Sequence, residues 1–150
     1  MRAVIQRVSE ARVTIEGTIK SEIRKGLLIL VGFEEADTED DLKWMSAKIA
    51  QMRIFGDEND LMNLSVKDIN GELLVISQFT LHAQTKKGNR PSFIKAAKPI
   101  TAIPLYERFV EHLRTDSGLK VLTGEFGADM KVSLLNDGPV TITMDSKNRE

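Results

Sequence analysis

Two apolar runs place the tightest limit on what this chain can fold into. The first, residues 26–33, contains the unbroken segment Leu27-Leu28-Ile29-Leu30-Val31. The second, residues 72–81, contains the apolar segment Leu73-Leu74-Val75-Ile76 before polar residues interrupt it. Uninterrupted apolar runs of this length are typical of strands that are buried on both faces. We therefore predict a sheet with these two strands at its centre.

The other predicted strands are shorter segments bounded by turn-forming residues. They alternate in polarity or are rich in β-branched side chains, and they cover residues 3–8, 11–15, 18–23, 63–67, 119–123, 130–135 and 140–144. The Asn70-Gly71 pair is the strongest short hairpin signal and predicts a hairpin between residues 63–67 and 72–81.

Two helices are predicted from apolar residues at helical spacing. The first covers residues 38–54, with Thr38 as N-cap and Asp41 three positions later in a variant of the capping box. The second begins near Pro104, a favourable residue for a first turn, and ends at about Asp116.

These elements predict the α/β (α+β) class, with two main helices packed on one face of a mixed β-sheet that is curved or doubled and barrel-like. Adjacent strands without helices between them exclude a doubly wound parallel sheet. The length of 150 residues fits one domain, residues 1–150, and the polar residues 145–150 are expected to form a frayed tail.

Missing residues and motifs exclude several kinds of chemistry. The chain has no cysteine, which removes disulfides, thiolate metal sites and a cysteine nucleophile. Neither a G-x-S-x-G elbow nor a glycine-rich phosphate loop occurs. The only histidines, His82 and His112, lack the close spacing of a zinc pair. We expect no metal and no cofactor.

No segment reaches the roughly 20 apolar residues that span a bilayer, and the first residues alternate like a strand rather than a signal peptide. We therefore expect a soluble cytoplasmic protein that makes no membrane contact.

The segment Asn136-Asp137-Gly138-Pro139 separates the last two β-patterned runs. Asn and Asp hydrogen-bond their own backbone, Gly adopts positive φ readily, and Pro fixes φ at about −65°. We predict a hairpin turn in which Pro139 is the first residue of the following strand, where a missing N–H is harmless. Local sequence leaves open whether this segment is purely structural or functional.

The window between Glu72 and Glu107 contains no acidic residue. Its cationic side chains are Lys86, Lys87, Arg90, Lys95 and Lys98. Because the whole chain carries −1 and this window +5, the rest carries −6. Such a distribution is typical of a surface that binds a polyanion, and a solvated loop without carboxylates is the alternative. His82 lies in the same window as either a phosphate contact or a strand-end residue, and His112 is expected on the helix surface.

Polar side chains interrupt the second central strand at Ser77-Gln78-Phe79-Thr80-Leu81. Alternation places Gln78 and Thr80 on one face of this strand. They are either a pair that binds substrate or a face that meets water. Thr80 is a possible nucleophile, but no base is evident beside it in sequence.

Three motifs in this order resemble the D-aminoacyl-tRNA deacylase family. They are Ser77-Gln78-Phe79-Thr80-Leu81, Lys87-Gly88-Asn89-Arg90-Pro91-Ser92-Phe93 and Asn136-Asp137-Gly138-Pro139-Val140-Thr141. The opening Met1-Arg2-Ala3-Val4-Ile5-Gln6-Arg7-Val8 is similar to the first strand of that family, so the resemblance covers the whole chain.

The resemblance implies an editing hydrolase that acts on the 3′ acceptor end of aminoacyl-tRNA. Its substrates are D-aminoacyl-tRNA and glycine mischarged on tRNA-Ala, and its products are free amino acid and tRNA. It also implies a homodimer in which Gly138 and Pro139, joined by a cis peptide bond, reach into the partner's pocket. An L side chain would collide with this backbone, whereas a D side chain or a hydrogen would not.

The same resemblance implies roles for single residues. Ser77, Gln78, Phe79 and Thr80 line the catalytic side of the pocket, where backbone amides around Phe79 and Thr80 stabilise the oxyanion and the 2′-hydroxyl of the tRNA activates the reaction. Arg7 braces the Gly138-Pro139 element from behind. The phosphate contacts are Lys86, Lys87 and Arg90.

Two other functions remain open from sequence. The basic window and the lack of catalytic side chains also fit a dimeric tRNA- or RNA-binding module without catalysis. A small dimeric structural protein, with Gly138-Pro139 as an ordinary turn, is the third possibility.

Overall fold

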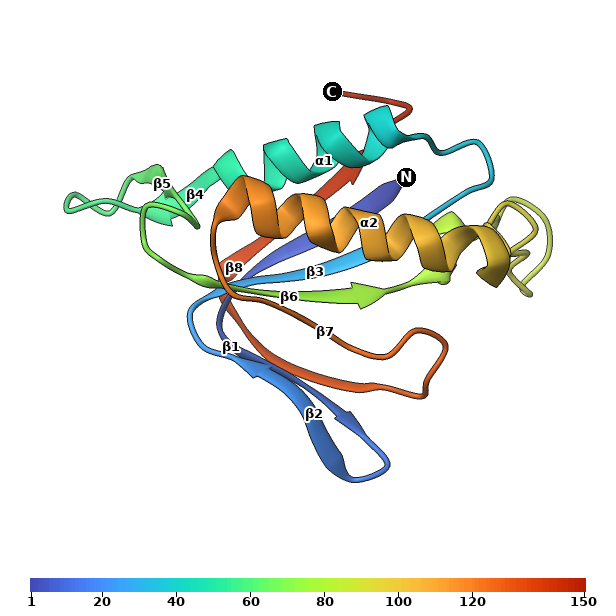
Figure 1. Ribbon diagram of the computed structural model, residues 1–150, viewed down its shortest axis with the longest axis horizontal. Helices are drawn as coiled ribbons and strands as arrows, with labels where there is room; N and C mark the ends of the chain where they lie inside the picture. The colour runs from blue at the N-terminus through green and yellow to red at the C-terminus, as the bar shows by residue number, and fades with distance from the viewer.

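The computed structural model describes residues 1–150 as a strongly curved, nearly closed sheet with two helices side by side over one of its faces (Figure 1). The main sheet has the strand order β2-β1-β3-β6-β7, and β8 pairs with β1. These strands are β1 (Arg2–Ile15), β2 (Thr18–Ile23), β3 (Gly26–Gly32), β6 (Glu72–Ser77), β7 (Val121–Thr123) and β8 (Lys131–Asp145). The helices are α1 (Glu39–Gln51) and α2 (Pro99–Ser117).

The two predicted central strands are confirmed. β3 and β6 pair in parallel from Gly26 opposite Glu72 to Val31 opposite Ser77, while β1 pairs antiparallel with β2, β3 and β8. Alternate residues of β3 enter two different cores: Leu27 faces the core under the helices and Leu28 the core inside the curved sheet. Burial on both faces explains the unbroken apolar run. The predicted fold class is thus confirmed.

Both helices cover the same face of the sheet, but their observed bounds differ from the predicted ones. Thr38 caps α1 and forms the capping box with Asp41 as expected, yet the helix ends at Gln51, because the next residues form β4 (Arg53–Gly56). α2 begins at Pro99, so the prediction of a start near Pro104 was wrong and Pro104 lies inside the helix. The amide of Ala97 donates to the carbonyl of Phe33 at 2.8 Å and fixes the chain just before α2.

The hairpin predicted at Asn70-Gly71 does not form. β4 pairs with β5 (Met62–Ser65) in a separate two-stranded sheet, whereas β6 joins β3. Asn70 does adopt the positive φ of 50° that the motif favours. After this turn, β6 begins beside β3, and the Glu72 amide donates to the carbonyl of Lys25 at 3.1 Å.

The hairpin predicted at residues 136–139 is also wrong. β8 is one strand that pairs with β1 on both sides of this segment, from Lys131 opposite Thr14 to Asp145 opposite Arg2. The register shifts twice between Gln6 and Glu10, so the segment is an irregularity inside a long ladder. Pro139 is therefore not the first residue of a strand; proline occurs inside strands at such bulges.

The last residues contact the body of the molecule, in contrast to the expected frayed tail. The amide of Ser146 donates to the carbonyl of Met1 at 2.9 Å, and Lys147 binds the Asp41 carboxylate at 2.7 Å. The guanidinium of Arg149 lies 4.6 Å from the ring centroid of Trp44. Neither helix combines the length and the apolar character that crossing a membrane requires.

Candidate active site

The candidate site begins where the central strand β6 ends. β6 stops at Ser77, and residues 79–82 form the short 3-10 turn η1 (Phe79–His82). The predicted alternation of side chains across residues 77–81 is therefore wrong beyond Ser77. Gln78 still donates its amide to the carbonyl of Val31 at 2.6 Å, which ties the turn to β3.

The turn leaves two backbone amides available. Its first hydrogen bond runs from the Leu81 amide to the carbonyl of Gln78 at 3.3 Å, so the amides of Phe79 and Thr80 have no acceptor within the turn. The side chains of Gln78 and Thr80 are joined directly, because Nε2 of Gln78 donates to Oγ1 of Thr80 at 2.6 Å. Thr80 thereby orients Gln78.

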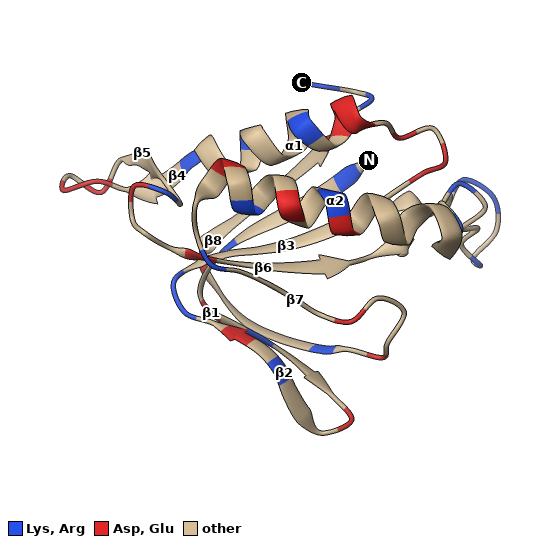
Figure 2. Ribbon diagram, in the orientation of Figure 1, with Lys and Arg blue, Asp and Glu red and all other residues tan.

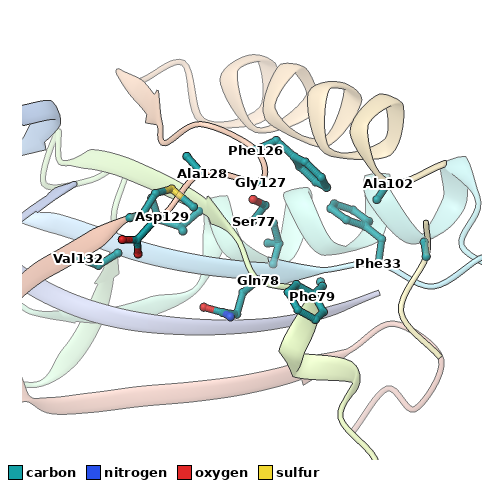
Figure 3. A pocket seen from close by; sticks show the side chains of 15 residues that line it. Phe33, Ser77, Gln78, Phe79, Ala102, Phe126, Gly127, Ala128, Asp129 and Val132 are labelled. Atoms are coloured by element: carbon teal, nitrogen blue, oxygen red, sulfur yellow. The ribbon is translucent and has the colours of Figure 1, made fainter. Parts of the chain in front are cut away.

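A cavity of about 270 Å³ lies beside this turn. Ser77, Gln78 and Phe79 line it on one side, and Phe126 lies on the opposite wall below α2 (Figure 3). Thr80 is not among the lining residues, and its side chain contacts Gln78. The cavity thus has a mostly apolar wall with a few polar groups at one end, as small-molecule sites usually have.

Sequence reasoning missed the wall that the loop between β7 and β8 contributes. Phe126, Asp129 and Met130 all line the cavity. The ring of Phe126 lies 6.0 Å from that of Tyr106 on α2, whose hydroxyl donates to the carbonyl of Val75 at 2.8 Å. Burial of this hydroxyl raises the pKa of Tyr106 to about 12. The local signal, Gly124-Glu125-Phe126-Gly127, predicts only a connection between strands.

Arg7 holds the irregular segment of β8. Its Nε donates to the carbonyl oxygen of Asp137 at 3.0 Å and its Nη1 to that of Ile54 at 2.7 Å. From the other side, Nδ2 of Asn136 donates to the carbonyls of Arg7 and Val140, both at 3.0 Å. The backbone of this segment is therefore fixed by hydrogen bonds on both flanks.

The peptide bond between Gly138 and Pro139 is cis, and Gly138 has a φ of 129°. Both residues are exposed, together with Asp137. They do not line the cavity of their own chain. Leu135, just before the segment, is 60% exposed. One chain therefore presents a stiff, exposed backbone segment beside an uncovered apolar side chain.

The predicted phosphate contacts lie together on the loop between η1 and α2, which is dense in basic residues at the right of Figure 2. Gln84 and Ser92 close the loop through a β-bridge. No ion pair neutralises Lys86, Lys87 or Arg90, although the chain forms eleven such pairs elsewhere. These charges are free to meet an anion.

The two histidines do not join the site. His82 is 2% exposed, and its Nδ1 lies 4.0 Å from Oε2 of Glu34, so it cannot contact a phosphate at the surface. His112, expected at the surface, is half-buried and contacts Glu39 on α1. That hydrogen bond lowers the pKa of Glu39. No group of three His, Cys, Asp or Glu side chains is arranged to hold a metal ion.

The match to a protein-family model assigns the chain to a class of hydrolases that act on tRNA. A family model described as D-Tyr-tRNA(Tyr) deacylase matches residues 4–145. The chain therefore belongs to the D-Tyr-tRNA(Tyr) deacylase family.

Relatives match over their full length. Proteins named D-aminoacyl-tRNA deacylase from Flavobacterium johnsoniae and Bacteroides fragilis are 67% and 63% identical over 150 residues, with all of both chains covered. A solved structure titled c-Myc DNA Unwinding Element Binding Protein superposes with a TM-score of 0.90 at 41% identity, covering 97% of this chain and 98% of the other. A probable eukaryotic D-amino acid tRNA deacylase, at 16% identity and a TM-score of 0.81 over 95% and 97% of the chains, shares the fold.

Proposed function

We propose that this protein is an editing hydrolase that cleaves the ester bond of D-aminoacyl-tRNA to release free D-amino acid and tRNA. The observation that carries the proposal is the end of β6, where Ser77, Gln78 and Phe79 line the cavity and the amides of Phe79 and Thr80 have no acceptor within the turn. Full-length relatives named D-aminoacyl-tRNA deacylase support the same reaction. We infer one deacylase domain over residues 1–150.

In the proposed reaction, water attacks the carbonyl carbon of the ester. The negative charge that develops on the carbonyl oxygen is stabilised by the amides of Phe79 and Thr80, which are held in place before the substrate arrives. The bond to the ribose oxygen then breaks, and that oxygen takes up a proton. The neighbouring 2′-hydroxyl of the tRNA assists this step. Asp129, the carboxylate that lines the cavity, is paired with Lys131, whose Nζ donates to Oδ2 of Asp129 at 2.9 Å. Thr80 is a positioning residue that orients Gln78.

Chirality is selected by the backbone of Gly138 and Pro139 from a second copy of the chain. This part of the proposal is supported by two properties of one chain: the segment is exposed and held on both flanks, and it is absent from its own cavity. A wall of fixed backbone cannot rotate away as a side chain can. It therefore excludes an L side chain and admits a D side chain or the hydrogen of glycine, including glycine mischarged on tRNA-Ala.

The exposed cations Lys86, Lys87 and Arg90 contact phosphates near the acceptor end. Their position on the loop that follows η1 supports this role, because the loop starts at the site itself. Contacts of this kind position the RNA without reading its sequence, so tRNAs of different sequence are accepted.

The decisive assay compares D-Tyr-tRNA and L-Tyr-tRNA and measures the release of free tyrosine. We expect rapid loss of the D-ester and no acceleration for the L-ester. The alternative, a non-catalytic RNA-binding module, is favoured by the free cations of the basic loop and predicts binding of both RNAs without hydrolysis of either. That result would remove the enzyme proposal.

The position of Gly138 in a partner's pocket is tested by mixing two variants that each have reduced activity. Gln78→Ala damages the cavity and Gly138→Ala damages the inserted segment. In a mixed dimer, one of the two pockets contains an intact cavity and an intact segment, so partial activity returns. If each pocket is built from one chain, mixing restores nothing.

A further inference from the structure

Two exposed phenylalanines meet at the rim of the cavity. The ring centroids of Phe79 and Phe93 are 5.2 Å apart, and the ring planes make an angle of 78°, so the pair is edge to face. Phe79 is 55% exposed and Phe93 is 37% exposed. Phe79 lines the cavity and Phe93 does not. Phe93 is therefore an exposed aromatic surface that lies outside the cavity and contacts its lining through Phe79.

The chain between the two rings fixes their position relative to the basic loop. Gln84 and Ser92 exchange two backbone hydrogen bonds of 2.8 and 3.0 Å, which close the loop directly before Phe93. The carbonyl of Phe93 then accepts the amide of Ala96 at 3.0 Å, and the amide of Ala97 binds the carbonyl of Phe33 in the cavity wall. These hydrogen bonds therefore connect the ring of Phe93 and the basic loop to the wall of the cavity.

An exposed aromatic ring beside unpaired cations is the usual way to hold unpaired nucleotides. Bases stack on the ring whatever their identity, and phosphates meet the Lys and Arg side chains. The loop supplies Lys86, Lys87 and Arg90 within seven residues of Phe93, and none of the three forms an ion pair within the chain. The acceptor end of a tRNA is a single strand of this kind.

We propose that Phe93 stacks on the base of the nucleotide that precedes the terminal adenosine. The inference rests on the proposed function, which places the terminal aminoacyl-adenosine in the cavity. A cavity of about 270 Å³ is at the small end of ligand sites, which leaves no room for a second nucleotide beside the terminal one. That nucleotide then lies beyond Phe79, where Phe93 is exposed.

The test measures binding of uncharged tRNA, so that it does not depend on hydrolysis. Two ligands are compared: tRNA with its natural 3′ end, and the same tRNA with an abasic residue at the position before the terminal adenosine. The abasic RNA keeps every phosphate and lacks only the base that Phe93 would contact. The variants are Phe93→Leu, which removes the ring, and Phe93→Tyr, which keeps it.

For natural tRNA, we expect Phe93→Leu to raise Kd about tenfold and Phe93→Tyr to leave it unchanged, as loss of one stacked base predicts. For the abasic tRNA, wild type and Phe93→Leu should bind equally, because the contact is already lost. Such non-additivity is the signature of a direct interaction. The matched control is Ile94→Ala, which removes a neighbouring side chain that is 84% exposed.

Three results would overturn the proposal. Equal weakening of both RNAs by Phe93→Leu would mean that Phe93 only supports Phe79, and no weakening of either would mean that it contacts no base. A changed oligomeric state of Phe93→Leu in sedimentation would mean that a second copy of the chain covers the ring. A failure of the proposed function is measured in a separate assay: the wild-type protein would then leave D-Tyr-tRNA unhydrolysed.

Discussion

The guanidinium group of Arg7 donates a hydrogen bond to the carbonyl oxygen of Asp137 at 3.0 Å. A second bond from the same group reaches the carbonyl of Ile54 at 2.7 Å. One rigid side chain thus connects β1 to β4 and to the segment that we place in a partner's pocket. Lysine cannot reproduce this geometry, because it has no planar fork of donors.

We therefore expect Arg7→Lys to lower kcat/KM on D-Tyr-tRNA by about tenfold or more, through loss of a charge-assisted hydrogen bond worth about 1.5–3 kcal/mol. The measurement is steady-state deacylation, with circular dichroism to verify the fold. Arg12→Lys is the control, since Arg12 lies on the same strand, is exposed and forms no ion pair. Equal loss in both variants would contradict a specific role for Arg7.

Gly138→Ala tests the backbone segment itself. Gly138 has a φ of 129°, and a Cβ there would lie 2.9 Å from Nη2 of Arg7 and 3.1 Å from the amide of Val140. An L residue in such a backbone conformation is strained by about 1–3 kcal/mol. We expect the segment to shift and deacylation to fall by about 10- to 100-fold, because that strain adds to the activation barrier.

The control for Gly138→Ala is Gly17→Ala in the turn between β1 and β2. Gly17 also has a positive φ, of 77°, but open space surrounds it. Its substitution should lower Tm without changing kcat/KM. Full activity of Gly138→Ala would favour the reading of the segment as an ordinary structural feature.

Removal of the Thr80 hydroxyl separates two mechanisms. If Thr80 only orients Gln78, Thr80→Ala keeps measurable activity, with a loss of about tenfold for one hydrogen bond. A substrate whose terminal ribose lacks the 2′-hydroxyl should lose about 10²–10⁴-fold, the usual contribution of general acid–base catalysis. Complete loss of activity in Thr80→Ala, together with a trapped threonyl ester on the wild-type protein, would show instead that Thr80 is a covalent nucleophile.

The basic loop should control the salt dependence of binding. Each phosphate contact to a single strand contributes a slope of about −0.7 in log K against log salt concentration. We expect Lys86→Ala, Lys87→Ala and Arg90→Ala each to reduce the slope for tRNA by roughly that amount. Lys20→Ala, an exposed residue of β2, is the control and should leave the slope unchanged. Unchanged slopes in all four variants would exclude the loop from the RNA contact.

Tyr106 should make the fold sensitive to alkali. Burial raises its pKa to about 12, against about 10 when the chain is unfolded. Between these values the unfolded state has lost a proton that the folded state retains, so the free energy of unfolding falls as pH rises from about 10 to 12, by roughly 2–3 kcal/mol. Below pH 10 this contribution is constant. Urea unfolding at several pH values should show a smaller loss in Tyr106→Phe than in wild type. Part of the loss remains in the variant, because the hydrogen bond to Asp41 raises the pKa of Lys147, which also loses its proton in alkali.

Sequence patterns predicted the centre of this fold because a strand that is buried on both faces has an unbroken apolar sequence. The run Leu27-Leu28-Ile29-Leu30-Val31 has no polar position, since each residue enters one of two cores. The start of α1 was also predictable, because Thr38 and Asp41 form their capping box within one turn of chain. Both signals depend on interactions that lie close together in sequence or on a single strand.

The path of the chain was harder to predict. Asn136-Asp137-Gly138-Pro139 specifies local dihedral angles, and both a tight turn and a bulge use such residues. Only pairing with β1, about 130 positions away, decides that β8 continues in the same direction. The start of α2 depends similarly on the contact of Ala97 with Phe33. Neither contact is visible in local sequence.

The candidate site was predicted in part. Ser77, Gln78 and Phe79 line the cavity, whereas Thr80 lies outside its lining because η1 replaces the last part of the predicted strand. Phe126 and Asp129 reach the cavity from a loop whose residues carry no distinctive motif. The predicted roles of Arg7, Gly138 and Pro139 come from the resemblance to a family rather than from residue spacing.

The continuity of β8 also limits how its irregular segment can change. A hairpin tip tolerates an extra residue, because the two strands that it joins keep their own register. In β8, one inserted or deleted residue between Asn136 and Val140 would shift everything after it by one position against β1. Ile142 and Met144, which pack against the core below the helices, would then turn to the opposite face. The length of the segment is therefore set by the core.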